Sequence, residues 1–271
     1  MYSNGFNQRN FGISFMTELD EEWGSSVARR GFRNEEDVAE KFRNWETDED
    51  AREWLEIMGY NAEDVENVNV ENLSRNIKSD IEVEVKSGEE VDTEGISIKR
   101  AKESANYNQV DKRWVENYGK KWDVPEEVVK ALKMFVGRKG FRPGQIEKLE
   151  TEPENLKDDR RLYFDEIPEE YSEQLKNFFK ENKHRIMRDI LKGEPPKQTD
   201  WILITQIHEE ETRWTLRSID NAFEILSGEF DTSRRGNIKL GSITIQRKGG
   251  DGGRETAQML QFKIRPFDLV D

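Results

Sequence analysis

A carboxylate and a lysine nineteen positions apart are the residues of this chain best suited to chemistry. Asp80 stands at the start of a strand-like run, and Lys99 ends the sequence Ser97-Ile98-Lys99 further along. A hairpin of that length would bring the two side chains together. Asp holds a hard divalent cation through oxygen, and the cation polarises a phosphoryl oxygen and lowers the pKa of its water. A lysine orients or deprotonates that water and offsets charge on phosphorus. The pair is therefore the minimum for metal-dependent phosphodiester hydrolysis.

Two other interpretations of this region stay open. Asp80 and Lys99 are also compatible with an ordinary β-hairpin that carries solvated charges at its ends. Glu84-Val85-Lys86 fits the pattern acidic-x-Lys better than Ser97-Ile98-Lys99 does. If a strand starts at Asp80, however, Glu84 and Lys86 lie along that same strand, spread over roughly 20 Å. We prefer Lys99 because it returns beside Asp80 on the neighbouring strand.

A polar segment, Ser104 to Trp114 (SANYNQVDKRW), follows Lys99. Its amides are suited to reading base edges, its tyrosine to wedging between base steps, and its cations to holding phosphates. The amides are Asn106, Asn108 and Gln109, the tyrosine is Tyr107, and the cations are Lys112 and Arg113. The alternative is a loop followed by an amphipathic helix, with Tyr107 and Trp114 in the core.

The stretch Ile243 to Ile264 (ITIQRKGGDGGRETAQMLQFKI) predicts two strands around a glycine-rich loop. Arg, Lys and Gln are the side chains that read guanine and adenine edges in the major groove. This hairpin carries Gln246, Arg247, Lys248, Arg254, Thr256, Gln261 and Lys263. The alternative is an exposed sheet edge protected by charge.

Composition narrows the class of protein. The chain has 271 residues and a formal net charge of −14, yet Ile98–Arg142 holds twelve Lys and Arg against six Asp and Glu, and Asp231–Arg265 holds eight against three. The absence of cysteine excludes a disulfide framework and suits a reducing cytoplasm. Two histidines, His184 and His208, are too few for a His-rich metal centre and receive no role. No apolar run approaches the roughly 20 residues of a membrane span, and no signal peptide is expected.

The elements that must position these residues follow from periodicity and capping signals. Along the chain, helices are followed by strands, then by a helix and by more strands. This order indicates a mixed α/β domain whose sheet is assembled from distant segments. A first helix is expected to begin at Asn34. Further helices are expected over Asp50–Met58, Pro125–Val136, Glu169–Leu191 and Ala222–Leu226. The expected strands cover Ile81–Val85, Gly95–Lys99, Trp201–Ile207 and Trp214–Leu216, with a polar turn at Gly88–Gly95.

The chain resembles the PD-(D/E)xK type II restriction endonucleases, in particular the four-base-pair cutters related to MspI and, among these, the GCGC-cutting branch. The resemblance runs from about Gly31 to Pro266. It rests on GFRNEEDVAEKFRNW, KSDI, ISIK, YNQVDKRW, DDRRLYF and GNIKLGSITIQRKGGDGGRETAQMLQFKI. It implies a central mixed β-sheet flanked by helices. It also implies an N-terminal extension (1–30) before one domain (31–271), with a catalytic part (31–137) and a DNA-recognition part (161–271).

The resemblance further implies Mg²⁺-dependent cleavage of both strands of DNA and a methyltransferase partner that protects the host genome. By position, Asp80 is the metal-binding carboxylate and Lys99 the catalytic lysine. Ser97 stands at the second acidic position, a departure from the consensus, and the carbonyl of Ile98 is a further metal ligand. Glu35 matches a position that supports the metal through water, although it also suits a helix N-terminus.

For recognition, the resemblance places Tyr107 where the branch has an intercalating Phe, and Asn108 and Gln109 in a base-reading loop. It places Gln261 and Lys263 at guanines and adjacent bases, with Arg247, Lys248, Asp251 and Arg254 along the same hairpin. Cleavage at GCGC with a two-base 5′ overhang is expected. The alternatives are another four-base site such as CCGG, a mismatch or damage repair nuclease, and an inactive DNA-binding module. Both a monomer and a homodimer are compatible with a palindromic site.

Overall fold

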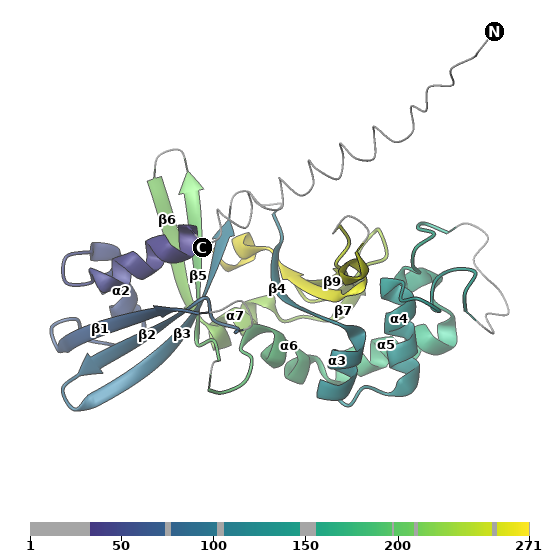
Figure 1. Ribbon diagram of the computed structural model, residues 1–271, viewed down its shortest axis with the longest axis horizontal. Helices are drawn as coiled ribbons and strands as arrows, with labels where there is room; N and C mark the ends of the chain where they lie inside the picture. Colours follow the sequence, from purple (N-terminus) through teal and green to yellow (C-terminus); the bar gives the residue numbers. More distant parts are fainter. Residues whose placement is uncertain are drawn as a thin grey trace, which may run out of the picture.

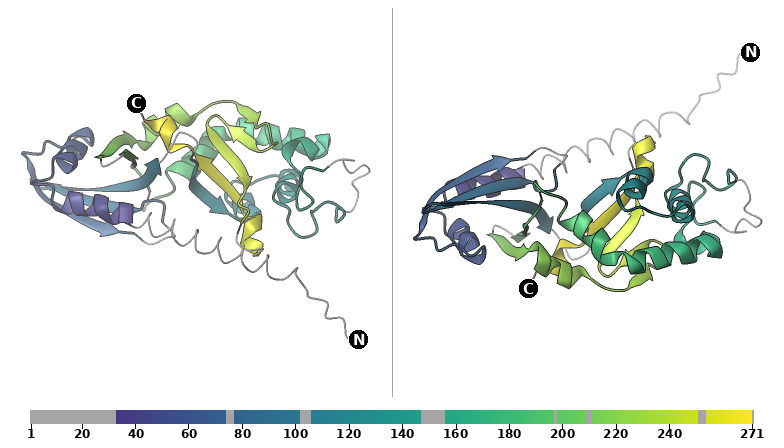
Figure 2. Two further views of the ribbon diagram at one scale, coloured as in Figure 1. Left: turned by 90° about the horizontal axis from the view of Figure 1, so that it is seen from above. Right: turned by 90° about the horizontal axis from the view of Figure 1, so that it is seen from below.

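The computed structural model describes residues 33–73, 77–101, 106–146, 156–196, 198–208, 211–250 and 254–270. The predicted extension, 1–30, lies outside these residues. Two five-stranded sheets organise the described chain, and they lie one beyond the other along its long axis (Figures 1 and 2). In the described part no helix is long and apolar enough to cross a membrane.

The first sheet is mixed, as the sequence predicts, and it is built from both halves of the chain. Its order is β1-β2-β3-β5-β6, and only the β3–β5 pair is parallel. Its strands are β1 (Val65–Asn72), β2 (Ile81–Ser87), β3 (Glu90–Ala101), β5 (Trp201–His208) and β6 (Glu211–Ser218). The strands β3 and β5 come from distant segments, so the sheet forms only when the two halves of the chain meet.

The β2–β3 hairpin is tighter than the sequence suggests. Ser87 pairs with Glu90, so the chain turns at Gly88 and Glu89, and the predicted turn at Gly88–Gly95 is wrong. Most of that segment belongs to β3 but projects at the exposed end of the sheet. Solvent on both faces removes the apolar alternation by which a strand is usually found.

The second sheet is antiparallel throughout, in the order β4-β10-β9-β8-β7. Its strands are β4 (Asn108–Arg113), β7 (Phe230–Thr232), β8 (Ile238–Leu240), β9 (Ile243–Arg247) and β10 (Leu260–Ile264). The predicted strand pair within Ile243–Ile264 is confirmed. It lies inside the sheet rather than at an edge, because β10 pairs with both β9 and β4. The interpretation of this hairpin as a charge-protected edge is therefore wrong.

Helices cover both sheets. An unlabelled helix at 33–43 and α2 pack on the first sheet, α7 contacts β5 and β6 of that same sheet, and α3 to α6 surround the second (Figure 1). They are α2 (Glu49–Ile57), α3 (Val115–Lys121), α4 (Glu126–Val136), α5 (Glu169–Glu181), α6 (Lys183–Leu191) and α7 (Ile219–Leu226), with 3₁₀ turns at Phe164–Glu166, Glu255–Gln258 and Pro266–Leu269. The single helix predicted at Glu169–Leu191 is wrong. Asn182 breaks it, and its side chain bonds to the Phe178 carbonyl oxygen at 3.0 Å.

Two hydrophobic cores meet at the β3–β5 pair. Ile98 and Leu203 belong to the core of the first sheet, whereas Ala101 and Ile204 belong to the larger core around the second. The parallel strands thus form a wall between the cores, and that wall carries Lys99.

Candidate active site and DNA-contacting face

The β2–β3 register brings the predicted chemical residues together. Ile81 pairs with Ile96, which places Asp80, just before β2, beside Ser97. Ser97 and Lys99 share one face of β3 because alternate residues of a strand point the same way. Lys99 Nζ lies 3.0 Å from Asp80 Oδ2 and 3.1 Å from the Ile98 carbonyl oxygen. The structure thus unites Asp80, Ser97, Ile98 and Lys99 in one cluster.

One carboxylate oxygen of Asp80 is fixed by the protein, and the other is not. Oδ2 accepts hydrogen bonds from the Ile98 N–H at 2.6 Å, the Ser97 hydroxyl at 3.2 Å and Lys99 Nζ. Among the described residues no hydrogen bond or ion pair ends on Oδ1. The side chain of Asp80 keeps 25% of its exposure, so Oδ1 is available to a ligand.

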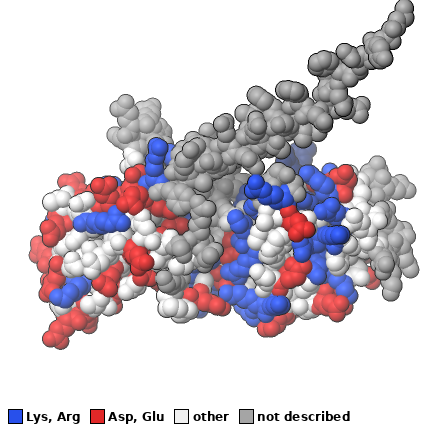
Figure 3. Space-filling view, in the orientation of Figure 1, with Lys and Arg blue, Asp and Glu red and all other residues white. Residues whose placement is uncertain are grey.

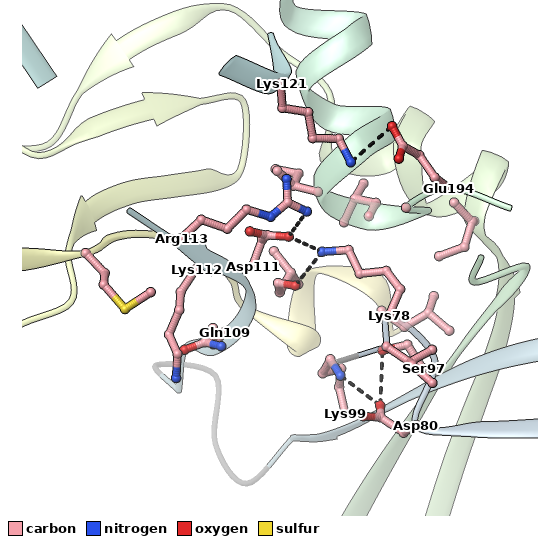
Figure 4. Close-up of a pocket in the computed structure, with 18 residues that line it drawn as sticks. Lys78, Asp80, Ser97, Lys99, Gln109, Asp111, Lys112, Arg113, Lys121 and Glu194 are labelled. Atoms are coloured by element: carbon pink, nitrogen blue, oxygen red, sulfur yellow. Dashed lines mark hydrogen bonds and ion pairs between the residues drawn. The ribbon is translucent and has the colours of Figure 1, made fainter. Parts of the chain in front are cut away.

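The cluster opens into a cavity of about 630 Å³ (Figure 4). Asp80, Ser97 and Lys99 line one end, and Gln109 and Lys112 of β4 line another. The cavity therefore joins the candidate chemical residues to a strand of the second sheet.

A buried charge network, missed at the sequence level, forms the inner wall of this cavity. Lys78 pairs with Asp111, which also binds Arg113 at 2.9 Å and the Tyr118 hydroxyl. Arg113 reaches Asp189 at 2.7 Å, and Lys121 bridges Asp189 and Glu194. Lys78 lies 33 residues from Asp111, and Arg113 lies 76 residues from Asp189, so no local sequence pattern predicts the whole network.

Burial sets the electrostatics of this wall. It lowers the pKa of Lys78, although the Asp111 carboxylate opposes the shift. Burial also raises the pKa of the Tyr118 phenol, and the adjacent Asp111 charge adds to that effect. Burial acts to raise the pKa of Asp189, but hydrogen bonds from Arg113 and Lys121 outweigh it and hold that pKa below the ordinary value. A fully paired network of this kind can remain charged in a low-dielectric interior.

Glu35 and the competing Glu84 and Lys86 lie elsewhere. Glu35 belongs to the helix at 33–43 and does not line the cavity. Glu84 bonds to Asn69, and Lys86 pairs with Glu66 on the exposed surface of the first sheet. These contacts separate Glu84 and Lys86 from the cluster around Asp80.

The second sheet has one apolar and one polar face. Ile238, Ile245 and Phe262 pair across β8, β9 and β10 and are fully buried. The intervening positions form the polar face, a set that we define as Lys239, Thr244, Gln246, Gln261, Lys263, Gln109 and Lys112. Gln261 Nε2 donates to Gln109 Oε1 at 2.7 Å, while Gln261 Oε1 is buried and has no hydrogen-bond partner in the part of the chain that the structure describes. A buried unsatisfied acceptor is costly unless a ligand satisfies it.

A second cavity, of about 500 Å³, opens on the polar face. Cations gather around it, and within the described chain no side chain among them forms an ion pair or a hydrogen bond. They are Arg234, Arg235, Lys239 and Lys263. Burial lowers the pKa of Lys263, since no nearby carboxylate compensates for it. Tyr107 also lines this cavity and is 46% exposed.

Other predicted contact residues have more structural surroundings. Arg113 lies on the face opposite Lys112 because neighbouring residues of a strand point to opposite faces, and its guanidinium reaches Asp189. Asn108 donates to the Arg100 carbonyl oxygen at 3.2 Å. Arg247 Nε donates to the Ala257 carbonyl oxygen at 3.0 Å, and burial, with Arg160 nearby, lowers its pKa.

The remaining predicted residues lie at the margins. Lys248 follows β9, and Arg254 and Thr256 lie near the turn at Glu255–Gln258. Asn106 precedes β4 and is partly buried. Asp251 falls outside the described residues. Charges are segregated between the two halves of the molecule, with Lys and Arg gathered over the half that holds the second sheet (Figure 3).

Comparison with known proteins identifies the class. The family model described as R.HinP1I restriction endonuclease matches residues 58–270. The chain therefore belongs to the R.HinP1I restriction endonuclease family. It is a type II site-specific deoxyribonuclease.

A solved structure supports the fold. The chain resembles restriction endonuclease MspI, a structure determined in complex with its cognate DNA, with a TM-score of 0.58 and 13% sequence identity. The match covers 95% of this chain and 99% of that chain. A comparison with curated protein sequences finds no match. The likeness confirms the restriction-endonuclease-like mixed α/β fold.

Proposed function

We propose that the cluster of Asp80, Ser97, Ile98 and Lys99 hydrolyses both strands of DNA at GCGC, leaving a two-base 5′ overhang. The observation that carries this proposal is the 3.0 Å contact between Lys99 Nζ and Asp80 Oδ2 at the end of a cavity that reaches the polar face. Family membership supplies the reaction class, and the four-base site follows from the resemblance in the sequence.

The oxygen donors of this cluster suit Mg²⁺. Asp80 Oδ1 would be the first ligand, and the Ile98 carbonyl oxygen and the Ser97 hydroxyl would add to it, the hydroxyl directly or through water. Among the described residues no group of three or more His, Cys, Asp or Glu could hold a metal. Mg²⁺ keeps several waters and binds through one or two carboxylates plus substrate phosphates, so a single carboxylate is sufficient. When bound, the cation would polarise the scissile phosphate and activate a water.

The chain's own residues position and stabilise the reacting groups. Asp80 Oδ2 and the Ile98 carbonyl oxygen hold Lys99 Nζ at a fixed place in the cavity. From there the ammonium orients the attacking water and offsets the charge that develops on the phosphoryl oxygens. Ser97 keeps the Asp80 carboxylate oriented. We propose that Glu35 supports the metal through a water molecule.

The polar face and its flanking segments are proposed to contact duplex DNA. MspI was solved with its cognate DNA, and the unpaired cations around the second cavity supply sites for phosphates or guanine edges. Gln109, Gln246, Gln261 and Lys263 then read bases, while the exposed Tyr107 inserts at the central step. Arg234, Arg235 and Lys239 extend the predicted set. The remaining predicted contacts are Asn106, Asn108, Lys112, Arg113, Arg247, Lys248, Asp251, Arg254 and Thr256.

The partners of this activity follow from the proposal. A cognate methyltransferase would protect host DNA without binding this chain. A palindromic target admits a homodimer or a monomer that cuts the two strands in succession, and sedimentation with and without DNA distinguishes them. The proposed location is the cytoplasm, where both genomic and invading DNA are accessible.

Digestion of unmethylated plasmid with Mg²⁺, followed by sequencing of fragment ends, tests the function. Discrete fragments ending at GCGC support it. Discrete fragments at another site, such as CCGG, would overturn the GCGC assignment and keep the reaction class. Cleavage only at mismatches or lesions would favour a repair nuclease. Tight duplex binding without cleavage at any salt concentration would favour an inactive binding module.

A matched pair of lysine variants tests the centre. Lys99→Ala should abolish cleavage yet retain specific binding, because its ammonium acts on the reacting groups. Lys86→Ala removes an exposed lysine, paired with Glu66 on the adjacent strand, and should cleave like the wild type. Unchanged cleavage by Lys99→Ala would show that the centre is misplaced.

A further inference from the structure

Lys78 connects the loop that carries Asp80 to the second sheet. It lies two residues before Asp80, and only 14% of its side chain is exposed. Its Nζ donates to the Val110 carbonyl oxygen at 2.9 Å and pairs with the Asp111 carboxylate (Figure 4). We propose that Lys78 is a positioning residue that couples target recognition on β4 to the placement of Asp80. This inference rests on the proposed function.

The contact falls at an irregularity in β4. Lys263 pairs with Gln109 and Phe262 with Asp111, so the register skips Val110. Such a bulge re-aims the side chains around it. Here it leaves Gln109 on the polar face and turns Asp111 inward. Lys78 Nζ binds both the carbonyl oxygen of Val110 and the carboxylate of Asp111. A displacement of Gln109 on DNA binding would therefore move the two groups that hold Lys78.

The segment from Lys78 to Asp80 is tightly held by other contacts. A Cβ added to Gly193 would lie 2.8 Å from Lys78 Cγ, which shows how closely the loop packs on the lysine stem. The Ser79 hydroxyl donates to the Gln198 carbonyl oxygen at 2.8 Å, and the Asp80 N–H donates to the Ile96 carbonyl oxygen at 2.8 Å. A tightly packed segment transmits small displacements instead of absorbing them.

The rest of the network does not reach Asp80. Arg113, Lys121 and Asp189 are bound to one another and to α6, and none of their ion pairs involves residues 77–80. If Lys78 is removed, Arg113 and Tyr118 still donate to Asp111. Lys78→Met therefore keeps the stem and the compensated carboxylate while removing the connection.

The test compares single-turnover cleavage and DNA binding by the full chain. The substrate is a duplex carrying the site found by fragment-end sequencing, and a second duplex differs from it by one base pair. For Lys78→Met, we expect the cleavage rate on the cognate duplex to fall by about 10- to 100-fold. Binding without Mg²⁺ should stay within about twofold, because Lys78 lies behind the contact surface. The ratio of cognate to near-cognate cleavage rates should fall about tenfold.

Lys121→Met is the matched control, because Lys121 lines the same cavity but, among the described residues, forms its ion pairs with Asp189 and Glu194 alone. It should keep the wild-type rate and ratio. If Lys78→Met does not fold by circular dichroism, Asp111→Asn carries the same expectation. Single-turnover rate constants do not depend on the folded fraction, which appears only in the amplitude.

Three outcomes overturn the coupling. They are an unchanged rate in Lys78→Met, an equal loss on both duplexes, or the same losses in Lys121→Met. Failure of the proposed function looks different, since the wild type would then not cleave, or Lys99→Ala would cleave normally. A cleaving wild type and an inactive Lys99→Ala leave the test of Lys78 unambiguous.

Discussion

Two lysines near the proposed DNA path differ in how their charge is compensated. The Lys99 side chain is held by Asp80 at 3.0 Å, whereas the Lys263 side chain has no hydrogen bond or ion pair within the described chain. Burial alone lowers the pKa of Lys263. An uncompensated, half-buried ammonium destabilises the free protein and becomes useful only when a ligand supplies acceptors. Lys263 thus lowers the stability of the free protein and strengthens the binding of DNA.

Lys263→Met should stabilise the free protein at pH 7, by on the order of 0.5–1 kcal/mol, and weaken DNA binding. The folded state disfavours protonated Lys263, so the unfolded chain binds more protons between its lowered pKa and 10.5. Wild-type stability therefore gains on the variant as the pH rises through that window. Urea denaturation at pH 7 and pH 10 measures the difference. An equal or lower stability of Lys263→Met at pH 7 would contradict this account, and Lys86→Met is the exposed control.

At the scale of elements, β4 explains why part of the site escaped sequence analysis. Strands are recognised by apolar alternation, and Ile81, Val83 and Val85 of β2 show it. In NQVDKR of β4, the inward positions hold the ion pair of the buried Asp111 and the partly buried Arg113 in place of apolar side chains. The pattern therefore resembles a loop. The role of Lys78 was not predicted for a related reason, because its partner Asp111 lies 33 residues away on this unrecognised strand.

The chemical cluster was predictable because its geometry is local. Asp80, Ser97 and Lys99 belong to one hairpin, and the antiparallel register alone brings them together. The polar face was predictable on β9 and β10 for the same reason. Arg234, Arg235 and Lys239 were missed because their cavity forms only when β7 and β8 join that hairpin.

Gly95, in the middle of β3, offers a test of how the hairpin is fixed against the rest of the fold. A Cβ on Gly95 would lie 2.1 Å from the Gln198 carbonyl oxygen and 2.5 Å from the Ser79 hydroxyl oxygen. Gly95→Ala should thus destabilise the fold by about 1–3 kcal/mol and displace Asp80, which follows Ser79. Thermal denaturation and single-turnover cleavage report the two effects. Thr93→Ala, at an exposed position of β3, should do neither. A fully stable Gly95→Ala would show that the 198–200 segment yields easily.

At the scale of the whole molecule, charge is divided between the two sheets. Residues 33–97 carry seven Lys and Arg against twenty-one Asp and Glu, whereas the two basic stretches contain almost all of the strand residues of the second sheet. Figure 3 shows the same division on one face. Such a molecule presents its basic half to DNA and turns its acidic half away. The overall charge of −14 is therefore no obstacle to binding.

DNA affinity should fall steeply with salt, because bound cations release counterions from the duplex. With six or more phosphate contacts, the association constant drops about 10³-fold between 50 and 200 mM salt. Lys239→Ala should reduce the slope of log affinity against log salt by about one. Lys86→Ala, on the acidic half, should leave the slope unchanged. Fluorescence anisotropy across a salt series measures both, and a salt-independent affinity would contradict the proposed face.

The two-faced strands β8, β9 and β10 also bear on how a lineage of such enzymes diversifies. Inward positions such as Ile245 and Phe262 are constrained by the volume that they fill. Outward positions such as Lys239 and Gln246 are constrained mainly by what they contact. Exchanges at alternate codons can thus alter the preferred target without repacking the interior, while the hydrolytic hairpin belongs to another sheet. Target preference can therefore change faster than chemistry, and if a methyltransferase protects the host as proposed, its own target must change in step.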